Sequence, residues 1–146
     1  LPPMRGATDV EACLGKMDRR YTPVEDQPGT FLIHGGDNMP PTAMRVDPPV
    51  VVIRVHVGDV TDLEANGELF RKLLSLNAKG LLRTSFGLED KRIVLQSALE
   101  LENLDYNELA ATLDEIDLTL AQHVPTLAEL SAKAASMPPS APKGQA

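Results

Sequence analysis

Three histidines are the residues of this sequence with the most versatile chemistry: His34, His56 and His123. Imidazole binds metals and exchanges protons near neutral pH, so each position is a candidate site. None of the three has a second histidine or cysteine at the short spacing typical of metal ligands. His34 and His56 would form a metal-binding pair only if their strands were neighbours. The pattern therefore predicts no metal site, and an enzyme that binds a metal or small molecule through His34 and His56 is kept as an alternative.

Other reactive groups form no recognisable catalytic motif. No serine lies in a G-x-S-x-G turn, and neither a P-loop nor a dinucleotide-binding glycine motif is present. Asp114 and Asp117 are about one helical turn apart and could share a cation, but a third and fourth oxygen ligand are missing. A solvated helix face is the simpler reading of these two aspartates. The sequence thus predicts no catalytic residue and no cofactor.

The distribution of charge limits the classes of partner. The chain has 146 residues and a formal net charge of −7. Between Ile93 and Ala132 there are eight carboxylates and no lysine or arginine. Such a region repels phosphate backbones, which argues against nucleic acid as a partner. No apolar run reaches the roughly 18 residues that a membrane span requires. The single cysteine excludes an internal disulfide framework and favours a cytoplasmic location.

Hydrophobic periodicity predicts the elements of the first half. Residues 1–7 are expected to be an extended arm, and a helix capped by Thr8 follows, with its apolar residues on one stripe. Residues 21–25 and 30–34 flank a Pro-Gly turn and predict a hairpin. The proline-rich segment 39–49 is expected to be a surface loop or an irregular edge strand. Residues 50–57 then alternate in hydrophobicity along one long strand.

The long strand of residues 50–57 has two different faces. Val51, Ile53, Val55 and Val57 form one apolar face. The other face is half apolar and half polar, which is typical of a strand covered on one side only. This mixed face is the first candidate surface for binding a partner, and its residues are Val50, Val52, Arg54 and His56.

The second half predicts a helix, a hairpin and an acidic helix. A helix capped by Thr61 is expected to end at Gly80 in a left-handed conformation, and strands 81–86 and 92–101 follow it. Asp105 has the position of a helix cap, and Pro125 is expected to kink or end that helix. A second helical piece would cover 126–135.

These elements assemble into one predicted domain. The fold class is α+β, with an antiparallel sheet, helices mainly on one face and the order α-β-β-β-α-β-β-α. The domain covers residues 8–135, and residues 136–146 form a low-complexity tail.

The acidic helix offers a second candidate surface. At about 100° per residue, Ala111, Leu118 and Gln122 lie opposite the apolar stripe of this helix. Leu118 is therefore expected to be exposed in an isolated subunit. A single exposed leucine is common on protein surfaces, so an ordinary exposed residue remains the alternative to a partner contact.

The centre of the chain resembles a known family. The segments that carry the resemblance are Leu74-Ser75-Leu76-Asn77, Phe86-Gly87-Leu88 before Arg92-Ile93-Val94-Leu95, and Leu101-Glu102-Asn103-Leu104-Asp105. Together with the order of elements, they resemble the type III secretion chaperone-like fold, which includes the CesT-type chaperones and the YbjN domain. The resemblance covers residues 8–130 and is weakest before Val50.

The resemblance implies a small, acidic protein that is not an enzyme. Members are commonly dimeric, and the secretion chaperones hold an extended partner segment against sheet and helix surfaces. The expected function is a non-catalytic protein-binding module, either chaperone-like or an accessory subunit of a larger assembly. The expected partner is another protein or subunit, in a homodimer or a larger complex. A regulatory signalling domain is a further alternative, because a fold does not fix a function.

Overall fold

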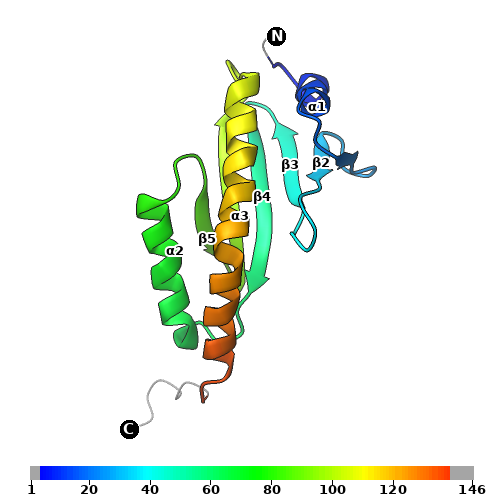
Figure 1. Ribbon diagram of the computed structural model, residues 1–146. Coiled ribbons are helices and arrows are strands. Elements are labelled where there is room, and N and C mark those ends of the chain that lie inside the picture. Colours follow the sequence, from blue (N-terminus) through cyan, green and yellow to red (C-terminus); the bar gives the residue numbers. More distant parts are fainter. Residues whose placement is uncertain (1–3, 139–146) are drawn as a thin grey trace.

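A single antiparallel sheet organises the protein, whose computed structural model describes residues 4–138. Residues 1–3 and 139–146 of the predicted arm and tail lie outside the described residues. The sheet has six strands in the order β1-β2-β3-β4-β6-β5 (Figure 1). Along the chain the elements are α1 (Ala7–Lys16), β1 (Tyr21–Pro23), β2 (Thr30–Ile33), β3 (Thr42–Asp47), β4 (Val50–Asp59), a 3-10 turn (Glu64–Asn66), α2 (Gly67–Lys79), β5 (Ser85–Glu89), β6 (Arg92–Glu100) and α3 (Tyr106–Ala135).

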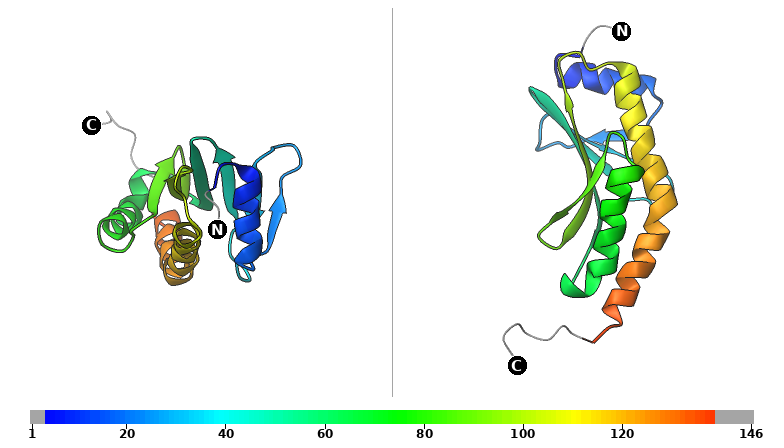
Figure 2. Two further views of the ribbon diagram at one scale, coloured as in Figure 1. Left: turned by 90° about the horizontal axis from the view of Figure 1, so that it is seen from above. Right: turned by 90° about the vertical axis from the view of Figure 1, so that its left-hand side faces the viewer.

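All three α-helices lie on the same side of the sheet. Viewed from above, α1, α3 and α2 lie along the inner side of the curved sheet, with α3 in the middle (Figure 2). The opposite face of the sheet carries no helix among residues 4–138. The predicted α+β class, with helices on one face of an antiparallel sheet, is therefore confirmed.

The sheet contains one strand more than the sequence predicted. Residues 42–47 form β3, which pairs with β2 on one side and β4 on the other, so they are neither a loop nor an edge strand. The observed order is α-β-β-β-β-α-β-β-α. The prolines at 40, 41, 48 and 49 flank this strand and leave its interior free of proline. Thr42, Met44 and Val46 are buried in strict alternation, as a half-covered strand requires.

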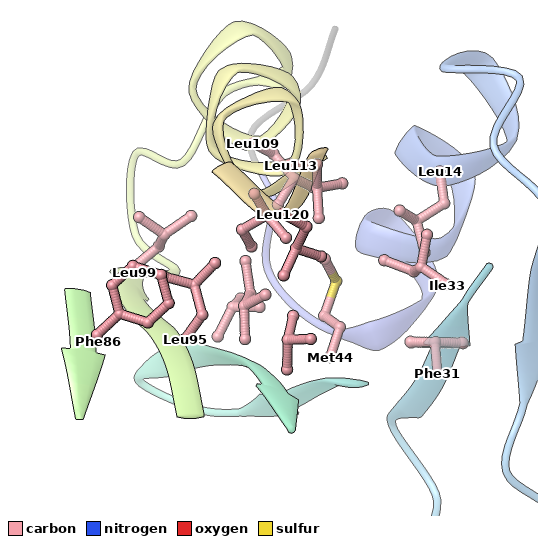
Figure 3. Packing of buried hydrophobic residues seen from close by; sticks show 14 of the residues in the cluster. Leu14, Phe31, Ile33, Met44, Phe86, Leu95, Leu99, Leu109, Leu113 and Leu120 are labelled. Atoms are coloured by element: carbon pink, nitrogen blue, oxygen red, sulfur yellow. The ribbon is translucent and has the colours of Figure 1, made fainter. Parts of the chain in front are cut away.

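Aliphatic side chains fill the space between the sheet and α3. Val51, Ile53 and Val55 of β4 are completely buried. Figure 3 shows Leu109, Leu113 and Leu120 of α3 pointing toward this layer. Each fully buried aliphatic side chain contributes about 1.5–3 kcal/mol relative to an exposed one. The alternation of the strands and the stripe of α3 therefore supply the main stabilisation of the fold.

The helix ends agree with the sequence only in part. Asp105 caps α3 as predicted, because its Oδ1 accepts a hydrogen bond of 2.7 Å from the Glu108 amide. Thr8 lies inside α1, whose cap position is Gly6. In the segment before α2, Asp62 and not Thr61 accepts the first amides, those of Glu64 and Ala65.

Two further predictions about helix ends are wrong. Gly80 has a φ of −110°, so the end of α2 is right-handed. Pro125 neither ends nor divides α3, which runs continuously for 30 residues. Proline removes one amide donor from a helix. The packing of α3 along the sheet, on both sides of Pro125, outweighs that loss, and the helix bows gently around the sheet (Figure 2).

An arginine joins α1 to α3. Arg19 lies just after α1, and its guanidinium contacts Asp114 at 2.6 Å and Asp117 at 2.8 Å. The Arg19 side chain is only 16% exposed, whereas the two carboxylates reach solvent. The two aspartates that could have shared a cation are therefore bound by a guanidinium of the same chain.

A carboxylate on α3 fixes the loop between α2 and β5. Glu115 accepts hydrogen bonds from the amides of Leu82 and Arg83, both at 2.9 Å, and from the Thr84 hydroxyl at 2.7 Å. Partial burial raises the pKa of Glu115, but the hydrogen bonds from Thr84 and the loop amides together lower the pKa by a larger amount. The net pKa lies below the ordinary value of 4.5. The charged form of Glu115 is therefore the form that stabilises the fold.

We predict that Glu115→Gln lowers the free energy of unfolding by about 1–2 kcal/mol at pH 7, because a charge-assisted contact is lost. Since the folded pKa of Glu115 is depressed, the stabilisation is complete above about pH 4.5 and is lost as the pH falls through the folded pKa. Urea unfolding at several pH values measures the difference. Glu129→Gln, an exposed glutamate of the same helix, serves as the control. An equal loss of stability in both variants would show that the hydrogen bonds of Glu115 to the loop do not stabilise the fold.

We also predict that Asp105→Ala costs about 1 kcal/mol of stability, because the Glu108 amide loses its acceptor. Asp105→Asn retains a capping oxygen and should stay within a few tenths of a kcal/mol of the original protein. Thermal unfolding of the two variants side by side provides the comparison. If alanine and asparagine behaved alike, the cap would have no energetic role.

Candidate functional site

The open face of the sheet brings the first group of predicted residues together. Val50, Val52, Arg54 and His56 point away from the helices along β4. The first three are half-buried and His56 is exposed. Because no helix of the described chain covers this face, these side chains can be reached by another molecule. The structure thus places all four on one accessible surface, whose binding role is still a prediction.

Arg54 and His56 on this face already have partners within the chain. Arg54 contacts Glu89 at 2.6 Å, and His56 contacts Asp59 at 2.9 Å. Arg54 Nε is buried and has no hydrogen-bond partner among the described residues. A shallow hollow of about 280 Å³ lies beside these groups, lined by Leu32, Pro41, Ala43, Arg54, His56, Glu89, Arg92 and Val94. The face is therefore mixed in chemistry and close to electrically neutral.

The histidines do not come together. His34 follows β2, whereas His56 lies in β4, and β3 separates the two strands. His34 Nε2 lies 2.9 Å from the Thr22 hydroxyl, so it is engaged with its own hairpin. Residues 4–138 contain no group of three His, Cys, Asp or Glu side chains that could hold a metal ion. The condition for a His34–His56 pair, adjacent strands, is not met.

The outer face of α3 contains the second group of predicted residues. Leu118 is 57% exposed, Gln122 is exposed and Ala111 is half-buried. Glu115 lies between them on the same face and holds the loop before β5. Because α3 lies on the covered side of the sheet, this face is separate from the open face of β4 (Figure 2). The structure therefore keeps the two predicted groups apart.

A third surface, between α2 and β5, was not predicted from the sequence. Leu74 is 68% exposed and Leu88 is 46% exposed, although both are large apolar residues. They border a groove of about 290 Å³ lined by Phe70, Leu73, Leu74, Asn77, Phe86, Gly87 and Leu88. We call this surface the edge groove, because β5 is the last strand of the sheet.

The sequence contained a signal for the edge groove. Phe70 and Leu74 lie beside the buried stripe of α2, which consists of Leu69, Leu73 and Leu76. An apolar stripe wider than the contact with the sheet leaves apolar side chains without a partner. The stripe of α2 is wider than its contact only because β5 is the last strand of the sheet. That strand order cannot be predicted from the periodicity of a helix.

Asn77, a polar residue in the lining of the edge groove, joins α2 to β5 by two hydrogen bonds. The Asn77 amide nitrogen donates to the Phe86 carbonyl at 3.0 Å, and the Phe86 amide donates to Asn77 Oδ1 at 2.7 Å. A side-chain amide has the same donor and acceptor as a peptide group. Asn77 therefore bonds to β5 in the way that a neighbouring strand would.

No helix among residues 4–138 is long and apolar enough to cross a membrane.

Several solved structures share this fold at low sequence identity. The ExoU–SpcU heterodimer from the type III secretion system of Pseudomonas aeruginosa aligns with a TM-score of 0.61 and 17% identity, over 80% of this chain and 95% of the matched chain. YbjN of E. coli aligns with a TM-score of 0.58 and 14% identity, over 88% and 93% of the two chains. The Yersinia pestis type III secretion chaperone SycH, solved with a stable fragment of YscM2, gives 0.55 and 15% over 83% and 98%.

Sequence comparison with families agrees with the structural likeness. No curated protein matches the chain. The family model CesT_Tir_1, however, matches residues 4–133. The match covers the whole sheet and all three helices, except for the last two residues of α3. The resemblance inferred from the segments around Leu74, Phe86 and Leu101 is thereby confirmed. The chain belongs to the CesT_Tir_1 family.

Proposed function

We propose that this protein is a non-catalytic, chaperone-like module that holds an extended segment of a second protein. The family match supports a protein-binding role, and two of the similar structures contain a secretion protein together with another protein. The observation that carries the proposal in this chain is the edge groove. It places exposed apolar side chains next to the outermost strand of the sheet.

The edge groove has the chemistry of a segment-binding site. Extended segments bind to sheet edges through their backbone and insert alternate side chains into neighbouring pockets. The volume of about 290 Å³ and the apolar lining suit one or two aliphatic or aromatic side chains. Leu74 and Leu88, which water now contacts, would be covered by such a segment. The gain would be about 25 cal/mol for each Å² of apolar surface removed from water.

The two predicted surfaces extend this proposal. A long segment that leaves the edge groove could continue across the open face, where Val50, Val52, Arg54 and His56 offer mixed contacts. The outer face of α3, with Ala111, Leu118 and Gln122, is the alternative contact for a partner or a larger assembly. A second copy of this chain is a further candidate occupant of the edge groove, and it would make the protein a homodimer. We also propose a cytoplasmic location for the module.

The test compares two exposed leucines on different helices. We predict that Leu74→Glu reduces the recovery of partner protein roughly tenfold or more, because it places a charge in the apolar edge groove. Affinity capture of the tagged protein from an extract of its own cells, with quantitative mass spectrometry, measures the recovery. Leu118→Glu changes the alternative surface on α3 and is the comparison variant, since Leu118 is 57% exposed and Leu74 is 68% exposed. Thermal unfolding verifies that both variants are folded.

Each outcome of this comparison has a defined meaning. Loss with Leu118→Glu and not with Leu74→Glu would move the site to α3 and contradict the edge groove. Equal recovery with both variants would also contradict it. Light scattering on the purified proteins tests the homodimer: a mass that falls from two copies to one in Leu74→Glu would identify a second copy as the occupant. If the original protein recovered no specific partner, the chaperone-like function would be wrong.

A further inference from the structure

The hollow in the open face of the sheet contains one cation without a partner. This hollow of about 280 Å³ is lined by side chains from β2, β3, β4, β5 and β6 and by Pro41, which precedes β3. Arg92, the first residue of β6, is exposed and belongs to the lining. Among residues 4–138, the Arg92 guanidinium has no ion pair and no hydrogen bond. It is therefore free to bind a group from outside the chain.

The two acidic neighbours of Arg92 in the sheet are engaged elsewhere. Glu89 of β5 and Asp59 of β4 lie directly opposite Arg92 in the two ladders that β6 forms. Glu89 contacts Arg54 at 2.6 Å, and Asp59 contacts His56 at 2.9 Å. The hollow thus contains two guanidiniums but only one carboxylate, and that carboxylate belongs to Arg54.

The charge of the hollow is opposite to that of the chain. The ionisable groups of its lining are two guanidiniums, one imidazole and one carboxylate, which belong to Arg54, Arg92, His56 and Glu89. With a neutral imidazole, two positive charges and one negative charge give +1, whereas the whole chain has a formal net charge of −7. The hollow therefore attracts an anion that the net charge of the rest of the chain repels.

The other side chains of the lining select the kind of anion. Four aliphatic residues lie beside the charged groups: Leu32, Pro41, Ala43 and Val94. A planar carboxylate matches the fork of donors on a guanidinium, and aliphatic neighbours that exclude water strengthen such a contact. One carboxylate balances the one unpaired positive charge. A phosphate dianion would bring a second negative charge close to Glu89, so the charges favour a carboxylate.

We infer that Arg92 binds the carboxylate of an aspartate or glutamate in the partner segment, and that an aliphatic side chain of the segment fills the hollow. This inference rests on the proposed function and names the chemistry of the segment where it crosses the open face. The hollow and the edge groove lie on opposite faces of β5, since Glu89 lines the first and Leu88 lines the second. An occupant of the edge groove, including a second copy of this chain, therefore contacts the other face of the strand.

A second copy is not the occupant that the charges of the hollow select. Its carboxylates have the required chemistry, but each copy has a formal net charge of −7. Repulsion between like charges opposes a contact between two copies that is held by charge. A segment of another protein needs only one acidic residue among aliphatic ones and brings no such net charge.

Three matched peptides test the chemistry of the hollow. The first is a capped five-residue peptide with glutamate at its centre, threonine on either side and leucine at both ends; the others have glutamine or phosphoserine at the centre. In an extended peptide the central residue and both leucines share one face. We expect the glutamate peptide to bind roughly three- to tenfold more tightly than either of the others. NMR titration measures the affinities, and the methyl signals of Ala43 and Val94 should shift.

Two arginine variants locate the preference for glutamate. Arg92→Gln should abolish the difference between the glutamate and glutamine peptides, because the unpaired guanidinium is lost. Arg20→Gln removes the same charge from an exposed arginine outside the lining and should keep the difference. The two protein forms at position 92 and the two peptides form a double-mutant cycle. In the affinity capture, Arg92→Gln should lower the recovery of partner roughly three- to tenfold, and thermal unfolding verifies that both variants are folded.

The outcomes separate this inference from the proposed function. Equal binding of the glutamate and glutamine peptides, or an equal effect of both arginine variants, would overturn the carboxylate site. Tighter binding of the phosphoserine peptide, or unchanged partner recovery with Arg92→Gln, would also overturn the inference. A light-scattering mass that fell in Arg92→Gln would assign the hollow to a second copy and contradict the inference. A glutamate preference that depends on Arg92, with partner recovery unaffected by Leu74→Glu, would support the hollow and contradict the edge groove.

Discussion

The burial of one face of a six-stranded sheet is the constraint on which the rest of the structure depends. A sheet of this size must cover its apolar side, and here a single long helix, α3, covers the centre. The alternation of burial in β3, over residues 50–56 of β4 and over residues 95–100 of β6 follows from this arrangement, because each strand has one face on the helices and one face open. The other two helices complete the cover at the sides, α1 near β1–β3 and α2 near β5 (Figure 1).

Polar contacts fix what the apolar layer cannot. Hydrophobic burial has no preferred direction, so it holds α1, α2 and α3 close to the sheet without setting their positions. Arg19 connects α1 to α3, Glu115 connects the loop before β5 to α3, and Asn77 connects α2 to β5. Each contact joins segments that are separate in the chain, and each uses groups that are at least partly protected from water. The position of α2, and with it the shape of the edge groove, depends on the last two.

Local patterns predicted the elements well where one residue type decides the outcome. Asp105 was identified as a cap because its oxygen lies three residues before an unpaired amide, and β4 was identified from its alternation. The prediction failed where neighbours in space decide. Because of the flanking prolines, the segment of β3 was predicted to be a loop or an edge strand. Its place inside the sheet comes from pairing with β2 and β4. Pro125 was expected to interrupt α3, but packing on both sides of it keeps the helix continuous.

The candidate surfaces show the same division between local and distant information. The face of Val50, Val52, Arg54 and His56 could be read from one strand, since the alternation of a strand assigns its faces. The edge groove required two facts that no single segment contains: that β5 ends the sheet and that α2 lies beside it. Asn77 illustrates the difference, because an asparagine within a helix has no distinctive local pattern, and its role appears only when Phe86 lies opposite it.

The strand order has a consequence for how the chain is made. β1 to β4 pair with their neighbours in sequence, so the strands of this part of the sheet are all made before the rest of the chain. The second partner of β4 is β6, which follows only after α2 and β5. During synthesis, the apolar strand β4 therefore has one unpaired edge for as long as those segments take to emerge. A protein proposed to hold extended segments of other proteins therefore obtains the second partner of its own central strand late in synthesis.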